Sequence, residues 1–146
     1  MSDRDLDLLE YRQLEEFRFQ IRRFLNFSET AAHAAGIEPQ QHQALLVLKA
    51  SGAENPPTIS HIAARLLLKH HSAVGLVDRL QALGLITRQA NPEDARQVLV
   101  RLTTKGERIL HNLSIAHRTE LEETVPRLIA ILQSIARRRK ERAPVV

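Results

Sequence analysis

The sequence predicts a mostly α-helical fold that contains one small β-hairpin. Aromatic residues make up only 3% of the 146 residues, so the core must consist mainly of Leu, Ile, Val and Ala. That composition favours helices over an all-β sandwich. Apolar residues recur at spacings of three and four along most of the chain, whereas they alternate in a segment near residue 100.

Glycine and proline bound the helices of the N-terminal half. The first helix is predicted over about residues 6–35, with Leu14, Phe17, Ile21 and Phe24 on one stripe. Pro39 suits the first position of the second helix, which ends near residue 51. Thr58 is a candidate N-cap for a third helix over residues 59–67. A polar break at residues 69–72 then precedes a fourth helix that stops at Gly84.

The periodicity changes after Gly84. Val98, Val100 and Leu102 alternate with Leu99 and Arg101, as in a strand with two distinct faces. Residues 85–89 are the expected partner strand, and residues 90–96 between the two are rich in turn formers. The sequence therefore predicts a β-hairpin with a long polar tip.

Two further helices are expected after the hairpin. Thr104 and Glu107 fit a capping box, with Thr103 as the alternative cap, and the first of these helices runs to about Arg118. Pro126 predicts that the last helix restarts or kinks. This helix carries an apolar heptad seam of Leu121, Val125, Leu128, Leu132 and Ile135. Amphipathic helices at both ends of the chain favour pairing with each other and with a second copy.

The composition and the motifs exclude several classes of function. The chain has no cysteine, which excludes disulfides, thiol redox sensing and thiolate metal sites. The seven histidines form no H-x-x-x-H or H-E-x-x-H pair, and no phosphate loop or G-x-S-x-G motif occurs. We therefore expect no enzyme, no cofactor and no metal, while a histidine cluster formed in three dimensions stays open. The chain shows no signal peptide and no membrane span, so a cytoplasmic protein is expected.

Residues 58–102 carry the functional signal. Two short helices joined by a tight break form a helix-turn-helix, whose second helix can enter the major groove of DNA. One arc of that helix is apolar and is expected to face the core: Ala73, Leu76, Val77, Leu80 and Leu83. The opposite arc and the following hairpin supply the candidate DNA contacts: Lys69, His70, His71, Ser72, Val74, Gly75, Arg79, Arg88 and Arg96.

The chemistry of these residues suits DNA. The polar residues 69–72 lie at a helix N-terminus, which favours phosphate. Val74 suits a thymine methyl, Gly75 permits close approach of the sugar-phosphate backbone, and Arg79 suits phosphate or guanine. A carboxylate at Asp78 repels phosphate unless a cation pairs with it, and the candidates for that cation are Arg65, Arg88 and Arg101.

The hairpin extends this surface. Arg96 at its tip is placed to reach an adjacent minor groove, as the wing of a winged helix does. Asp94 is expected to order the tip rather than contact DNA. An amphipathic helix of this kind could also be a plain surface helix, and the basic hairpin beside it favours DNA binding.

The run from His70 to Gly106 resembles the MarR family of bacterial and archaeal transcriptional regulators. The shared motifs are Asp78-Arg79-Leu80, Gly84-Leu85, Asp94 with Arg96, and Leu102-Thr103 with Gly106. The run Gly36–Gln41 also matches, except that Glu38 replaces the more usual small cap before Pro39. The resemblance covers essentially the whole chain. It implies one domain over residues 1–146, with a winged helix-turn-helix lobe at 38–103 and dimerisation helices at about 6–35 and 104–139.

The resemblance also implies a function. It implies that the chain forms a homodimer and binds a pseudo-palindromic operator in double-stranded DNA, usually as a repressor. It also implies that Arg96 enters the minor groove. In regulated members a small-molecule ligand binds between the dimerisation helices and the DNA-binding lobe and weakens operator affinity. Residues near such a cleft are Phe17, Phe24, Phe27 and His33, although core and dimer packing is their default role.

The alternative function is a winged-helix module that binds protein instead of DNA. Such a module is expected to expose apolar anchors on its recognition face. Here the recognition face and hairpin carry positive charge instead, which favours DNA.

Overall fold

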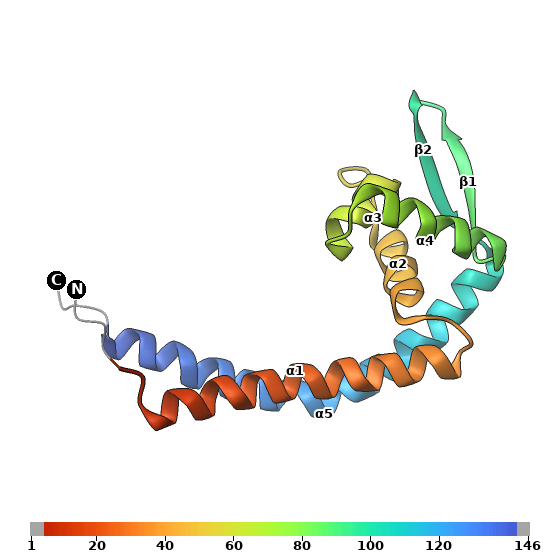
Figure 1. Ribbon diagram of the computed structural model, residues 1–146. Coiled ribbons are helices and arrows are strands. Elements are labelled where there is room, and N and C mark those ends of the chain that lie inside the picture. Colours follow the sequence, from red (N-terminus) through yellow and green to blue (C-terminus); the bar gives the residue numbers. More distant parts are fainter. Residues whose placement is uncertain (1–4, 143–146) are drawn as a thin grey trace. The chain divides into compact units, whose positions relative to one another are not determined.

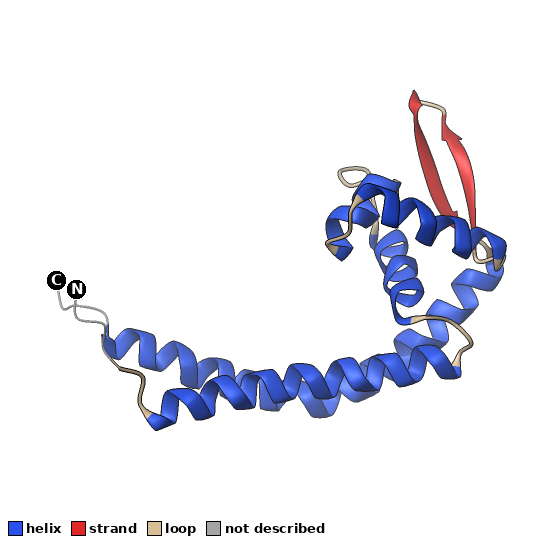
Figure 2. Cartoon of the chain, viewed as in Figure 1, coloured by secondary structure: helices blue, strands red, loops and turns tan. Residues whose placement is uncertain are grey.

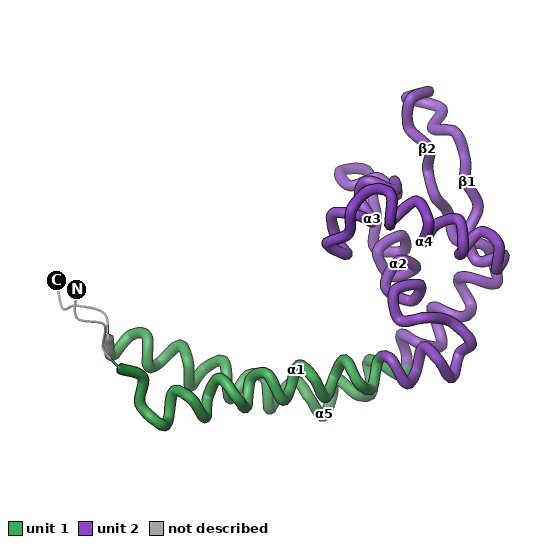
Figure 3. The backbone as a smooth tube through the Cα atoms, viewed as in Figure 1, with its two compact units in different colours: residues 1–28, 116–146 green, residues 29–115 purple. Residues whose placement is uncertain are grey.

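The computed structural model describes residues 5–142 and confirms a mostly helical chain with one hairpin (Figures 1 and 2). The elements in chain order are α1 (Leu8–Ala34), α2 (Pro39–Ala50), α3 (Ile59–Leu66), α4 (His70–Ala82), β1 (Ile86–Asn91), β2 (Asp94–Leu102) and α5 (Thr104–Arg142). They form two compact units (Figure 3). Unit 1 combines the described residues up to Ser28 with those from Ala116 onward, and unit 2 is Glu29–Ile115.

The core of unit 2 is built from α2, α3, α4 and the hairpin, together with Ala32 at the end of α1 and Leu110 and Leu113 of α5. Its largest fully buried side chains are Leu45, Ile62, Leu76, Val77, Leu80, Leu85, Ile86 and Val100. The predicted inward face of α4 is confirmed for Ala73, Leu76, Val77 and Leu80. Leu83 was wrongly assigned to that face and is exposed. The reason is that α4 has ended: Gly84 turns the chain at φ +72°, and Leu85 enters the core instead.

The turn between α3 and α4 is shorter than predicted. Thr58 caps α3 as expected, since its hydroxyl accepts from the His61 N–H at 3.1 Å. Leu67 has left-handed backbone geometry at φ +56°, and the Leu68 N–H donates to the Ala63 carbonyl at 2.9 Å. Because α4 begins at His70, Ser72 lies in its first turn and not in the break.

The hairpin is longer than predicted, and its tip is shorter. The strands pair antiparallel from Ile86 opposite Leu102 to Asn91 opposite Asp94. The tip is held by the Asn91 side chain, which donates to Gln97 Oε1 at 3.1 Å and accepts from the Glu93 N–H at 3.0 Å. These side-chain bonds extend the pairing into a segment whose composition is typical of a loop.

The predicted alternation of β2 holds only in part. Leu99 and Val100 are both buried, and Val98 is exposed. The Val100 N–H donates to the Pro57 carbonyl at 2.8 Å, so the loop after α2 covers this stretch of the strand. This bond lies at the edge of β2, and Leu99 and Val100, whose side chains point to opposite faces of the strand, are both buried.

The two C-terminal helices predicted from the sequence are one continuous helix. α5 runs through Pro126 without a break. It begins after Thr103, the alternative cap, whose hydroxyl accepts from the Gly106 N–H at 3.1 Å. The capping box at Thr104 was therefore wrong by one residue.

The interior of unit 1 is mainly polar. Among its described residues, those that are buried are Gln13, Gln20, Ser28, His117, Thr124 and Ile131. The predicted apolar stripes are buried only in part. Leu14, Ile21, Val125 and Leu132 are exposed, whereas the other members are half-buried: Phe17, Phe24, Leu121, Leu128 and Ile135. The pairing of α1 with α5 therefore covers only part of each stripe, as where Phe24 packs against His117.

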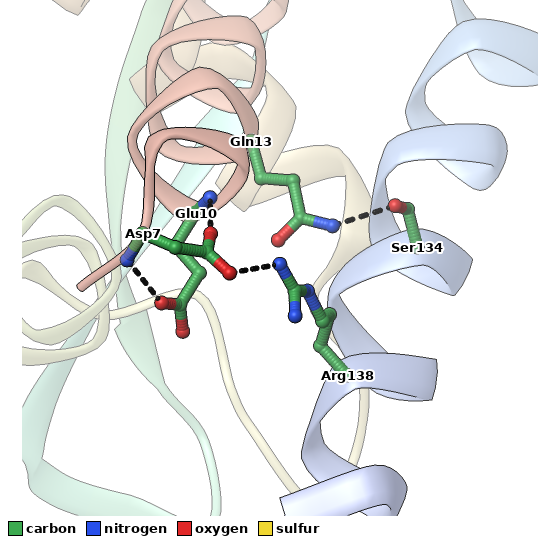
Figure 4. A network of polar contacts seen from close by, with 5 residues as sticks. All are labelled: Asp7, Glu10, Gln13, Ser134 and Arg138. Atoms are coloured by element: carbon green, nitrogen blue, oxygen red, sulfur yellow. Dashed lines mark hydrogen bonds and ion pairs between the residues drawn. The ribbon is translucent and has the colours of Figure 1, made fainter. Parts of the chain in front are cut away.

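A polar network closes one end of the α1–α5 pair (Figure 4). Asp7 and Glu10 cap the start of α1 reciprocally, each side chain accepting from the other's backbone N–H at 2.8–2.9 Å. The Asp7 carboxylate also pairs with Arg138, and Gln13 donates to the Ser134 hydroxyl at 2.7 Å. These bonds set the register of α1 against α5.

Candidate nucleic-acid interface

The first turn of α4 presents polar and basic groups to solvent. Lys69 is the N-cap residue and makes no side-chain capping bond, and His70, His71 and Ser72 are exposed. The first backbone N–H groups of a helix have no partner within it, and the helix dipole makes this end positive. This end of α4 can therefore receive a phosphate.

The rest of the predicted contact face of α4 is partly accessible. Val74 and Gly75 are half-buried, whereas Arg79 is exposed. The structure thus brings the α4 residues predicted to contact DNA onto the side of the helix opposite its core residues. Val74 lies at the border, as its position between the two arcs predicts.

Asp78 and Arg88 form an ion pair that joins α4 to β1. The Arg88 guanidinium contacts the Asp78 carboxylate and the Gln81 side-chain carbonyl. Of the three cations considered for Asp78, Arg88 is the one that pairs with it. Arg88 is only 28% exposed, so in this structure its guanidinium serves the wing–helix contact. The pairing neutralises the carboxylate closest to the predicted DNA face.

The tip of the hairpin presents an exposed cation. The side chain of Arg96 is 95% exposed. The Asp94 carboxylate accepts from the Arg96 backbone N–H at 3.0 Å, while its distance to Arg96 Nε is 3.7 Å. Asp94 thus shapes the backbone at Arg96 and leaves the guanidinium extended into solvent.

The Leu102-Thr103 and Gly106 motif joins the hairpin to α5. Thr103 donates from its backbone N–H to the Leu85 carbonyl at 3.0 Å and from its hydroxyl to the Gly84 carbonyl at 2.6 Å. A Cβ at Gly106 would lie 2.1 Å from the Leu85 carbonyl oxygen, so only glycine allows this approach. Lys105 adds a bond to the Leu83 carbonyl at 3.0 Å. The motif therefore anchors the wing at its base.

The residues proposed near a ligand cleft fall in different surroundings. In unit 1, Phe24 and Phe27 pack edge-on against His117, with ring centroids 5.9 and 5.2 Å from it. His117 is buried and lies 2.8 Å from the Ser28 hydroxyl. Phe17 is half-buried in the same unit. In unit 2, His33 is exposed and lies 3.3 Å from the Glu38 carboxylate.

His117 was not singled out from the sequence. A signal for it was present, because His117, Thr124, Ile131 and Arg138 recur every seven residues. This repeat marks the face of α5 that lies against α1, but its polar members hid it from a search for apolar periodicity.

Two further searches concern metals and membranes. Within residues 5–142, no three His, Asp or Glu side chains gather as ligands for a metal ion. No helix in that range is long and apolar enough to cross a membrane.

Comparison with known proteins shows which family this chain resembles. The sequence model of the MarR family matches residues 35–97, which include α2 to β1 and most of the wing tip. The HTH-type transcriptional regulator YkoM of Bacillus subtilis is 28% identical over 109 residues, or 73% of this chain and 69% of that protein. The matches span 62–69% of the lengths of three curated relatives, all HTH-type transcriptional regulators.

Solved structures share the fold along nearly the whole chain. A MarR family protein from Bacillus stearothermophilus has a TM-score of 0.71 at 20% identity, covering 96% of this chain and all of that one. The complex of MepR from S. aureus with DNA has a TM-score of 0.59 at 21% identity, covering 82% and 95%. CouR from Rhodococcus jostii RHA1, bound to p-coumaroyl-CoA, has a TM-score of 0.60 at 24% identity, covering 85% and 87%.

The anchored wing and its sequence motifs point to the same family as these matches do. The chain is therefore similar to the MarR family over residues 35–97 and shares its winged helix-turn-helix fold with the solved structures, while its curated relatives are HTH-type transcriptional regulators.

Proposed function

We propose that the chain binds a pseudo-palindromic site in double-stranded DNA as a homodimer and represses transcription from it. The observation that carries this proposal is the highly exposed Arg96 at the wing tip, beside a recognition helix whose single carboxylate is paired with Arg88. Two recognition helices would enter successive major grooves, and each Arg96 a flanking minor groove. The candidate contacts remain Lys69, His70, His71, Ser72, Val74, Gly75, Arg79 and Arg96, with Arg88 supporting them through Asp78.

The distribution of polar and apolar residues in unit 1 supports the homodimer. Its buried positions are mostly polar, while many large apolar side chains of α1 and α5 are exposed: Leu8, Leu9, Tyr11, Leu14, Phe19, Ile21, Leu25, Val125, Ile129 and Leu132. A soluble monomer rarely exposes so much contiguous apolar surface. A second copy offers the same stripes by symmetry and would bury both sets in one interface.

We also propose that a small-molecule effector regulates DNA binding. CouR was solved with p-coumaroyl-CoA, and relief of repression by a ligand is the mode that the family resemblance implies. In this chain the aromatic rings of Phe24 and Phe27 and the polar His117 and Ser28 combine apolar contact with hydrogen-bonding groups. A ligand bound there would act by changing the separation of the two recognition helices in the dimer.

The proposal is tested by a salt series of binding to duplex DNA from the region upstream of the protein's own gene. Wild type should bind as a dimer, with affinity that falls steeply as salt rises. Arg96→Ala should bind more weakly and reduce the salt slope by about one per protomer. Arg108→Ala is the matched control, since Arg108 is also an exposed arginine of unit 2 but lies on α5, outside the proposed face.

Equal affinity for this duplex and for a random duplex would show that the upstream region contains no operator for this protein. Absence of binding to all DNA, including a randomised duplex library, would contradict the DNA-binding proposal itself. The protein-binding winged-helix module would then be the better account, and a partner protein should be sought.

A further inference from the structure

The guanidinium of Arg79 lies near the space that a side chain at Gly75 would enter on α4. A Cβ built on Gly75 would lie 3.3 Å from Nη1 of Arg79. Optimal contacts between nonbonded heavy atoms are about 3.5–4.0 Å. A methyl group at position 75 would therefore require the end of the Arg79 side chain to move by a few tenths of an ångström.

The direction of the Arg79 side chain follows from helix geometry. Side chains on a helix lean toward its N-terminus, so a residue at i+4 reaches back over residue i. Arg79 thus lies over the turn that contains Gly75, toward the end of α4 that carries His71 and Ser72. The N-terminal part of a recognition helix is the part that contacts base edges.

The charge of Arg79 is available for a ligand. Its neighbour Asp78 pairs with Arg88 instead. In the part of the chain that the structure describes, no hydrogen bond or ion pair engages the Arg79 side chain. An exposed arginine with no internal partner suits bidentate recognition of guanine O6 and N7.

We propose that Gly75 is a seat for the Arg79 guanidinium and that the two residues act as one determinant of DNA sequence specificity. Arg79 reads a guanine in the major groove. Gly75 is a positioning residue, because its missing side chain lets the guanidinium lie close to the helix surface and reach the groove end of α4. This inference rests on the proposed DNA binding. It assigns Gly75 a role different from the close approach of DNA backbone that the sequence suggested.

The proposal has a distinctive signature in stability and binding. Gly75→Ala adds a good helix former, so it should not lower the melting temperature. It should nevertheless weaken DNA binding, since its methyl group displaces the guanidinium. A variant that binds worse without becoming less stable is not explained by misfolding.

The experiment is a double-mutant cycle on duplexes that wild type enriches from a randomised library. The variants are Gly75→Ala, Arg79→Ala and the double variant. Gly52→Ala is the control, because that glycine lies in a loop of unit 2 with no atom near its added Cβ. The probe for guanine reading is the same duplex with individual guanines replaced by 7-deazaguanine, which lacks the N7 acceptor.

We expect Gly75→Ala to weaken binding about fivefold when Arg79 is present and to have no effect when it is absent. One 7-deazaguanine substitution should weaken wild type and should have little effect on both single variants. Equal weakening by Gly75→Ala in the two backgrounds, or no weakening in either, would overturn the proposal. If wild type enriches no sequence, the proposed function fails and this inference fails with it.

Discussion

The pairing of Asp78 with Arg88 addresses an electrostatic problem at the scale of single residues. A carboxylate on the face of a recognition helix repels the phosphates that the helix must approach. Arg88 on β1 pairs with this carboxylate and also contacts Gln81, so it holds the wing against α4. The same contact removes the repulsion and links the two elements proposed to bind DNA.

Arg88→Ala should therefore weaken DNA binding even if Arg88 never touches DNA. The loss of stability should be small, up to about 1 kcal/mol, because the Asp78 side chain is 60% exposed. Asp78→Asn in the same chain should restore much of the affinity, since it removes the unpaired charge. Binding titrations and thermal melts of the two variants check this. Failure of Asp78→Asn to restore binding would instead favour a direct contact of Arg88 with DNA.

Gly106 is a second single residue whose identity matters, because only glycine fits at this position. A Cβ at this position would lie 2.1 Å from the Leu85 carbonyl oxygen, and backbone atoms cannot move aside as a flexible side chain can. Gly106→Ala should lower the free energy of unfolding by about 1–3 kcal/mol, as overpacking does. Urea denaturation measures this free energy of unfolding, with Gly52→Ala as the control variant. Equal stability of the two variants would show that α5 does not need this approach to the base of the hairpin.

At the scale of elements, α1 and α5 pair through polar groups in unit 1. The bonds from Asp7 to Arg138, Gln13 to Ser134 and Ser28 to His117 lie along the contact between the two antiparallel helices. Polar contacts of this kind specify the register of a helix pair better than a uniform apolar seam does. They also leave part of each apolar stripe exposed: Leu14, Ile21, Val125 and Leu132.

Two buried oxygens in this seam lack a partner within the described chain. They are Oε1 of Gln20 and Oγ1 of Thr124, on side chains of residues 3% and 1% exposed. Thr124→Val should therefore raise the free energy of unfolding by about 1 kcal/mol, since it removes an unsatisfied hydroxyl at nearly constant shape. Ser134→Ala, which removes the acceptor of Gln13, should lower it. A loss of stability in both variants would mean that the Thr124 hydroxyl finds a partner in the dimer.

At the scale of the whole molecule, the exposed apolar residues of α1 and α5 bear on the oligomeric state. Leu132 is 49% exposed, although it belongs to a heptad seam that the sequence predicts to be buried. Such a surface requires a partner, and the same stripes on a second copy are the simplest one.

Leu132→Glu should convert the protein to a monomer, because it places a charge at the centre of the proposed interface. Sedimentation measures the change in mass. Affinity for a two-half-site duplex should fall about 100-fold or more, since the monomer loses the gain from two linked contacts. Leu46→Glu is the matched control, a leucine on α2 that is 43% exposed and whose substitution should leave the dimer intact. A dimeric Leu132→Glu protein would place the interface elsewhere.

Much of this protein was determined by local sequence. The helices of the N-terminal half, the cap at Thr58, the turn at Gly84, the hairpin and most of the inward face of α4 follow from periodicity and backbone preference, which act over a few residues. The same signals placed the capping box at Thr104 and divided α5 into two helices, and both of these expectations were wrong. The contact residues on α4 could be chosen because a helix with one apolar face has only one other face to offer.

The tertiary structure decided the features that depend on residues far apart in the chain. The Pro57 carbonyl, far from β2 in the chain, accepts from the Val100 N–H at the edge of that strand, which the local pattern did not indicate. Arg88 lay among three candidate partners of Asp78, and only its position across from α4 selected it. The polar interior of unit 1 was hidden because apolar periodicity reports that a face is to be buried, not against which partner. Whether a side chain is buried depends on the surface that packs against it, and the periodicity of one helix does not identify that surface.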